Sequence, residues 1–519
     1  MNNNNNKLLL IGIDGATFAI INPLIQEGRL PNFARLMEKG SHGVLTSTIP
    51  PVSPVAWTSL MTGMNPGKHG IFDFTGKIPG TYEFKMNTAA DRAARPFWMH
   101  LSDAGKRVLV LGVTLTYPPD PVNGYMVSGL GMPPTKDISK CVYPPEFADM
   151  VLSAGQYRAV PEADLRKIFK SDGEKDRFLR GVMVQIGQRV TLFREMWKKE
   201  KFDFSMVFFL DTDGASHYFW KYMESGGAYA DAIFNVYQRV DQAIGELLET
   251  VGSEADVMLV SDHGFGPLRK VVFLNNWLES QGYLKFKKPG MLTRLKKIIR
   301  RPPKNAIDWS VTKAYFRGTI GNIFLNLKGR DPNGIVDPAD YPVFCKKITA
   351  ELLNIMDPET GERIVQSVYT GDELGTRDVP GAPDLVLTFN RGYSVVGDEI
   401  TLQGVRDTGT IITSSNNWSG NHEPDGILIA GGHGFKRGFA VQAATLPDIA
   451  PTILYLLGVP VPEAMDGKVL VDMFDKDAVG EGHVLYSRND GAADSAPQGL
   501  TQDESDMLVK QLRNLGYME

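Results

Sequence analysis

Three carboxylates and three histidines occur in settings that suit a metal site. Asp213 and His217 are four residues apart in DTDGASH, and Asp262 and His263 are adjacent in SDHG. An aspartate and a histidine at positions i and i+4 share one face of a helical turn, where both can bind the same ion. Each pair alone is more often structural, but six such residues are enough for two three-ligand sites with open positions for a substrate. The candidate ligands are Asp14, Asp213, His217, Asp262, His263 and His422.

Ser53, in PPVSPVAWTSLMTG, is a candidate nucleophile for phosphoryl chemistry. Pro is favoured at the first helical position, so Pro54 predicts that Ser53 is the N-cap of a helix that ends at Gly63. A helix N-terminus directs free amides at an anion, and a metal lowers the pKa of a bound hydroxyl. Ser53 can therefore cap the helix and act as a nucleophile at the same time.

Three apolar runs that end in aspartate predict the elements that position these side chains. KLLLIGIDG ends at Asp14, FSMVFFLDTDG ends at Asp211 and Asp213, and DVMLVSDHG ends at Asp262. Continuous apolar runs bounded by polar turns are typical of strands buried on both faces of a parallel sheet that helices cover. Ligands of such sheets bind outside the carboxyl ends of the strands. We therefore expect an α/β fold in which three carboxylate-bearing strand ends meet at one edge.

Composition restricts the classes of protein that this chain can represent. Its 519 residues suggest one large catalytic domain with insertions, or two to three domains. A net charge of -5 gives no general attraction to nucleic acid, so we expect no nucleic-acid polymer as a partner. Cys141 and Cys345 lie too far apart to suggest a CxxC zinc site or a disulfide framework. The early run LLLIGI is too short for a signal peptide, so we expect a cytoplasmic protein.

The order of apolar, helical and basic segments predicts how the chain is divided. Residues 285–304 carry nine Lys and Arg and no acidic residue. Such a run is most often a solvated face, but it could also give weak contact with an anionic membrane and make the protein peripheral to it. We expect a catalytic core in three parts, 1–135, 200–272 and 375–476, with a helical insertion over 136–199, a cap over 273–374, and a C-terminal linker and helix over 477–519.

The motifs, in their order along the chain, resemble the alkaline phosphatase superfamily in its type I phosphodiesterase/nucleotide pyrophosphatase branch. They are Asp14, PPVSPVAWTSLMTG, DTDGASH, SDHG and GNHEPDGILIAGG. The stretches FLNLKGRDPNGIV, APDLVLTF and LRNLGYME are similar to a bacterial and archaeal group of predicted phosphohydrolases or phosphomutases. The resemblance implies an alkaline-phosphatase-like fold, a mostly parallel sheet sandwiched by helices.

The resemblance also implies a phosphoric ester hydrolase with two divalent metal ions, Zn²⁺ or Mn²⁺. Asp14, Ser53, Asp262 and His263 would surround one ion, and Asp213, His217 and His422 the other. Ser53 would take the place of the family's nucleophile and form a covalent phosphoserine intermediate. The expected activity is that of a phosphodiesterase on a small phosphate ester or diester. The alternatives with the same site are a phosphomonoesterase, a phosphomutase, and a phosphoglycan or phospholipid headgroup transferase.

One departure concerns substrate binding. Ala56 stands where many nucleotide pyrophosphatases carry an asparagine that donates to a phosphate oxygen. Candidate replacements for that donor are Lys68, Lys313 and Arg317. Trp57 is a candidate for stacking a nucleobase or lining a leaving-group pocket, with core packing as the alternative.

Two histidines remain outside the candidate ligands. We expect His69 to form local contacts. We consider His433 a rim residue or a simple loop histidine.

Overall fold

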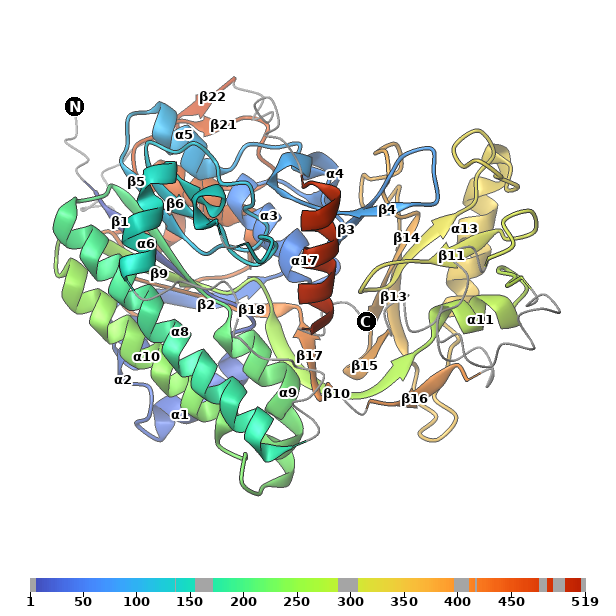
Figure 1. Ribbon diagram of the computed structural model, residues 1–519, viewed down its shortest axis with the longest axis horizontal. Coiled ribbons are helices and arrows are strands. Elements are labelled where there is room, and N and C mark those ends of the chain that lie inside the picture. The colour runs from blue at the N-terminus through green and yellow to red at the C-terminus, as the bar shows by residue number, and fades with distance from the viewer. Residues whose placement is uncertain are drawn as a thin grey trace. The chain divides into compact units, whose positions relative to one another are not determined.

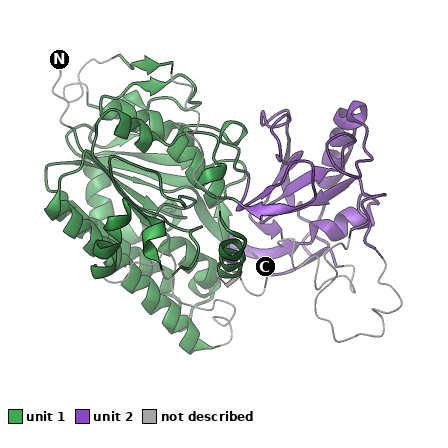
Figure 2. Ribbon diagram, turned by 45° about the horizontal axis from the view of Figure 1, so that its top comes forward, with its two compact units in different colours: residues 1–71, 87–266, 419–511 green, residues 72–86, 267–418, 512–519 purple. Residues whose placement is uncertain are grey.

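The computed structural model describes residues 6–135, 137–154, 171–287, 307–395, 410–415, 418–475, 483–488 and 500–514. Contacts divide the chain into two compact units, which Figure 2 shows in different colours. The first unit comprises residues 1–71, 87–266 and 419–511, and the second comprises residues 72–86, 267–418 and 512–519.

A ten-stranded sheet forms the centre of the first unit (Figure 1). Along the main path its order is β19-β2-β18-β9-β1-β8-β5-β6-β7, and β20 pairs with β2. The five strands from β9 to β6 run parallel, whereas β18 and β7 pair antiparallel with their neighbours in that group. The strands are β1 (Leu8–Ile13), β2 (Ser41–Thr46), β5 (Val108–Leu111), β6 (Gly124–Val127), β7 (Val142–Tyr143), β8 (Phe204–Phe209), β9 (Asp256–Val260), β18 (Asp425–Gly431), β19 (Phe439–Ala440) and β20 (Ala444–Thr445).

The apolar runs that predict buried strands do form the middle of this sheet. Every residue of β1, β8 and β9 is buried, as expected of strands with both faces covered. Leu10 of β1 lies opposite Met206 of β8 on one side and Met258 of β9 on the other. The predicted mostly parallel α/β sheet is therefore confirmed.

Two groups of helices pack around this sheet. One contains α1 (Phe18–Gln26), α2 (Pro31–Lys39), α8 (Asp172–Lys199), α9 (Asp211–Ser225) and α10 (Ala232–Val251), and α8 and α10 lie side by side in Figure 1. The other contains α3 (Ser53–Thr62), α5 (Phe97–Asp103) and α15 (Ile449–Leu456). The first unit also contains α4 (Pro66–His69), α6 (Ala148–Ser153), β17 (Gly420–Glu423), β21 (Val461–Pro462) and β22 (Tyr486–Ser487). No helix in the described ranges is long and apolar enough to cross a membrane.

The second unit has its own antiparallel sheet, in the order β11-β12-β14-β13. A cluster of buried aromatic and aliphatic residues fills its core. Its elements are β3 (Thr75–Lys77), β4 (Phe84–Met86), α11 (Leu274–Ser280), β11 (Ala314–Phe316), β12 (Asn322–Leu325), α13 (Tyr341–Leu352), β13 (Val365–Thr370), β14 (Leu385–Phe389), β15 (Gly392–Val395) and β16 (Ile412–Ser414). Strand β10 (Gly264–Val272) starts in the first unit and pairs with β15 and β16 in the second. Helix α17 (Gln502–Asn514), which belongs to the first unit as far as Gln511, occupies the stretch where we expected a C-terminal helix.

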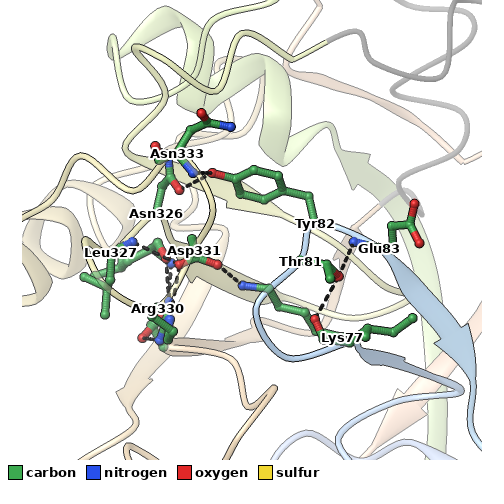
Figure 3. A network of polar contacts seen from close by, with 12 residues as sticks. Lys77, Thr81, Tyr82, Glu83, Asn326, Leu327, Arg330, Asp331 and Asn333 are labelled. Carbon is green, nitrogen blue, oxygen red and sulfur yellow. Dashed lines mark hydrogen bonds and ion pairs between the residues drawn. The ribbon is translucent and has the colours of Figure 1, made fainter.

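The unit boundaries differ from the predicted segments at two places. The hairpin β3-β4 lies inside the predicted first core segment, yet it belongs to the second unit. Figure 3 shows the reason: the buried Lys77 ammonium pairs with Asp331, and Tyr82 donates to Asn326 Oδ1 at 2.7 Å. The predicted third core segment, 375–476, is also divided between the units, because β14, β15 and β16 complete sheets of the second unit.

Candidate metal centre

Three neighbouring strand ends bring the predicted ligands together in the first unit. Strand β1 lies between β8 and β9 in parallel register, so the residues that follow the three strands meet at one edge of the sheet. Asp14 follows β1, Asp213 lies in the first turn of α9 after β8, and Asp262 and His263 follow β9. All four side chains are fully buried. His217 comes from α9, one turn after Asp213, and the half-buried His422 comes from β17.

The first group of side chains consists of Asp14, Asp262 and His263, which could hold one metal ion. His263 Nε2 lies 3.5 Å from Asp14 Oδ1 and 3.3 Å from Asp262 Oδ2. Ser53 Oγ donates to Asp14 Oδ1 at 3.4 Å and lies 3.3 Å from His263 Nε2. The predicted nucleophile therefore borders this group.

The second group lies around Asp213. Asp213 Oδ1 is 3.3 Å from His217 Nε2 and 3.2 Å from His422 Nε2. The two Nε2 atoms are 3.0 Å from each other. His263 also belongs here, because Asp213, His263 and His422 could hold an ion together and the rings of His263 and His422 stack at 3.7 Å. The structure thus places His263 with both groups, whereas the sequence assigned it to one.

Backbone carbonyls fix the orientation of all three imidazoles. A carbonyl oxygen only accepts, so each Nδ1 donates to it, and Nε2 is the ring nitrogen that faces the carboxylates. An outer hydrogen bond of this kind is what orients metal-binding histidines. The pairs are His217 Nδ1 with Gly420 O at 3.0 Å, His263 Nδ1 with Gly264 O at 3.0 Å, and His422 Nδ1 with Pro51 O at 2.9 Å.

The electrostatics of the cluster also fit bound cations. Burial, followed by the charge of Asp213, raises the pKa of Asp262 to about 8, and burial with the charges of Asp262 and Asp213 raises the pKa of Asp14 well above its ordinary value. Burial alone would raise the pKa of Asp213, but the His217 and His422 side chains hold it well below its ordinary range. In the described part of the chain no Lys or Arg pairs with Asp14 or Asp262. Buried carboxylates crowded against imidazole nitrogens are a donor set for divalent metals.

Helix α3 carries Ser53 as its first residue and not as its N-cap. Val52 is the N-cap, and no side chain caps the helix. The prediction for Ser53 is wrong by one residue, because its hydroxyl points at Asp14 and His263 instead of bonding to the helix amides. The predicted end is confirmed: Gly63 has φ 67°, a left-handed conformation that suits glycine, and its N–H donates to Ser59 O.

Hydrogen bonds from motif residues that are not candidate ligands hold the first strand end. Thr212 Oγ1 donates to the backbone oxygen of Asp14 at 2.5 Å, and Gly15 N–H donates to Asp262 Oδ1 at 3.3 Å. Trp57 Nε1 donates to Asp14 Oδ2 at 3.0 Å. Sequence reasoning missed the role of Thr212, because a threonine between two aspartates at a helix start carries no signal of a long-range partner.

The predicted substrate-binding residues differ in their surroundings. The ring of Trp57 is fully buried against Phe208 and is closed to a nucleobase. Lys68 donates to Ala464 O at 2.8 Å and pairs with Asp466 at 2.5 Å. These surface contacts link α4 to the segment that contains Ala464 and Asp466. Lys313 and Arg317 belong to the second unit.

The two remaining histidines have local roles. His69 forms the expected local contacts, with Ser59 Oγ at 2.9 Å and with the Ile71 N–H at 3.1 Å. His433 follows the C-terminal end of β18, at the edge of the sheet opposite to the cluster, and its N–H donates to Asp256. Residues 288–304 of the basic run lie outside the described residues.

Solved structures of other proteins share this fold. Human ectonucleotide pyrophosphatase/phosphodiesterase 5 is similar in structure, with a TM-score of 0.53 and 13% identity over 91% of this chain and 100% of that chain. The murine protein of the same name, an inactive form in complex with AMP, gives a TM-score of 0.54 at 13% identity over the same shares. At this identity the likeness shows the fold alone, and a comparison with curated proteins gives no match.

A model of the type I phosphodiesterase / nucleotide pyrophosphatase family matches residues 8–423, a range that contains every residue of the cluster from Asp14 to His422. The match confirms the resemblance seen in the motifs. With the family matched over most of its length, the chain belongs to the type I phosphodiesterase/nucleotide pyrophosphatase family and is a phosphoric ester hydrolase.

Proposed function

We propose that this protein is a metal-dependent phosphodiesterase in which Ser53 is the nucleophile. The observation that carries the proposal is the place of the Ser53 hydroxyl. It lies at the start of α3, within 3.4 Å of Asp14 Oδ1 and 3.3 Å of His263 Nε2. Two divalent ions, zinc or manganese, would be held by Asp14, Asp262 and His263 and by Asp213, His217 and His422.

The residues of the cluster give Ser53 a defined part in the reaction. Divalent ions, when bound, supply positive charge that favours the serine alkoxide and offsets the charge of the phosphate. Asp14 Oδ1 and His263 Nε2 lie beside the Ser53 hydroxyl and orient it. The Ser53 hydroxyl loses its proton to water as its oxygen attacks phosphorus, the bond from phosphorus to the leaving oxygen breaks, the leaving oxygen takes up a proton from water, and a phosphoserine forms. Attack by water on that phosphoserine releases the phosphate product and restores Ser53.

The substrate we propose is a small phosphate diester. AMP in the murine relative supports a nucleotide-containing ester, because that protein shares the fold. Ala56 offers no side-chain donor beside Ser53, so phosphate oxygens must be bound by other groups than in pyrophosphatases with asparagine there.

The test compares kcat/KM on bis-p-nitrophenyl phosphate and on p-nitrophenyl phosphate for the metal-loaded wild type and Ser53→Ala. We expect a preference for the diester, and a loss of about 10³-fold or more in Ser53→Ala with its metal content unchanged. Ser59→Ala is the matched control, because Ser59 is a buried serine of the same helix that bonds to His69. It should keep its activity.

Other outcomes of the same assay would contradict parts of the proposal. Unchanged turnover in Ser53→Ala would remove the nucleophile assignment. A preference for the monoester would indicate a phosphatase or phosphomutase. Transfer of the phosphoryl group to an added alcohol, in excess of hydrolysis, would indicate a transferase.

A further inference from the structure

We propose that Trp57 is a positioning residue that holds Asp14 as a one-oxygen metal ligand. The inference rests on the proposed function, since it concerns the same metal site. Trp57 Nε1 donates to Asp14 Oδ2 at 3.0 Å. The other carboxylate oxygen, Oδ1, is the one that faces Ser53 and His263. The indole thus occupies one oxygen of Asp14 and leaves the other for the cluster.

The indole is itself held rigidly. Trp57 lies one turn after Ser53 on α3 and is fully buried. Its ring packs edge-to-face on Phe208 of β8, with centroids 4.9 Å apart at 85°. It also lies against the backbone of β1 at Gly12, where a Cβ atom would come within 2.9 Å of Trp57 Cη2. Only glycine at this position leaves room for the ring, two residues before Asp14.

The backbone of Asp14 is fixed from the other side. Its N–H donates to Phe209 O at 2.9 Å, and its carbonyl oxygen accepts from Thr212 Oγ1 at 2.5 Å. The bond from Trp57 therefore restrains the remaining freedom, which is the rotation of the carboxylate. A ligand that is already oriented loses less entropy when an ion binds, and removal of such an outer bond typically weakens metal affinity about 10–100-fold.

Trp57→Phe removes the indole N–H and keeps an aromatic ring in the cavity. The experiment measures zinc binding to the full chain, stripped of metal by chelation, with a competing chromophoric chelator. We expect the wild type to bind two zinc ions. In Trp57→Phe the affinity for one ion should fall about 10–100-fold, while the affinity for the other stays the same because Trp57 bonds to Asp14.

Trp98→Phe is the matched control. Trp98 is also fully buried in the first unit, and its Nε1 donates to Asp120 Oδ2 at 2.9 Å. This variant loses the same kind of bond at a carboxylate outside the cluster, so both zinc affinities should equal those of the wild type. Gly12→Ala retains the indole N–H but displaces the ring, so it should weaken the same zinc ion as Trp57→Phe.

The outcomes separate the two proposals. A wild-type protein that binds neither zinc nor manganese would contradict the proposed metal site itself. If the wild type binds two zinc ions and the folded Trp57→Phe variant binds both with the same affinities, the positioning role alone would be overturned. Equal weakening in Trp57→Phe and Trp98→Phe would also overturn it, because the effect would then be one of general stability. Circular dichroism of each variant checks that it is folded.

Discussion

The buried ion pair of Arg189 and Asp211 predicts a large, partner-dependent loss of stability. An Arg189 guanidinium nitrogen, Nη1, lies 2.6 Å from Asp211 Oδ2, and the two side chains are 2% and 1% exposed. Burial raises the pKa of Asp211, and the charge of Arg189 opposes that rise. Arg189→Met would leave this carboxylate buried without its nearest cation. Breaking a buried pair on one side typically costs about 3–5 kcal/mol, and we expect a loss of that size at pH 7.

This loss is measured by urea unfolding of the full chain. The unfolding is followed by tryptophan fluorescence, and the free energy is extrapolated linearly to zero urea. The control is the double variant Arg189→Met/Asp211→Asn. A neutral amide is far easier to bury than a carboxylate, so the double variant should recover most of the stability. The pair also matters for the site, because Asp211 begins the helix that carries Asp213 and His217. A single variant that loses less than about 1 kcal/mol, or a double variant that recovers nothing, would refute this reasoning.

Two further predictions concern acid and metal removal. Burial, followed by the charge of Arg92, lowers the pKa of His69 to about 3. The contribution of the neutral His69 ring to the free energy of unfolding is therefore complete above about pH 6.5. It is lost toward pH 3 by about 1.4 kcal/mol per pH unit. Between pH 7 and 4, the free energy of unfolding in urea should depend less steeply on pH in His69→Gln than in the wild type. Equal slopes in the two proteins would contradict this prediction. Chelation should lower the thermal midpoint, because an ion at a thousand times its Kd contributes about 4 kcal/mol; a midpoint in calorimetry that EDTA leaves unchanged would contradict bound ions.

The middle of the sheet could be predicted because its signal is local. The runs before Asp14, Asp211 and Asp262 are almost entirely apolar, and that pattern indicates strands buried on both faces. The boundary between the two units could not be predicted in this way. It depends on the ion pair of Lys77 with Asp331, two residues that are 254 positions apart. The residues next to Lys77 in the sequence do not indicate that Asp331 is its partner.

Trp57 shows why residue type alone misjudges a site. As an aromatic residue four positions after the candidate nucleophile, it suits either nucleobase stacking or core packing, and both interpretations overlook its N–H. Whether that donor meets a carboxylate depends on how closely α3 approaches β1. Gly12 permits this approach, in a strand whose other residues indicate only burial.

The function of the three histidines depends on which ring nitrogen faces the cluster. The motifs place three imidazoles near three carboxylates, but only the Nε2 lone pairs can bind an ion there. Their direction is set by carbonyl oxygens: Gly264 directly follows His263, whereas Gly420 and Pro51 lie 203 and 371 residues from the histidines that they orient. A carbonyl is present at every residue, so no motif can encode these partners. The segments that carry Pro51 and Gly420 therefore shape the candidate site as much as the candidate ligands do, and a shift of either segment would turn an imidazole away while leaving each motif intact.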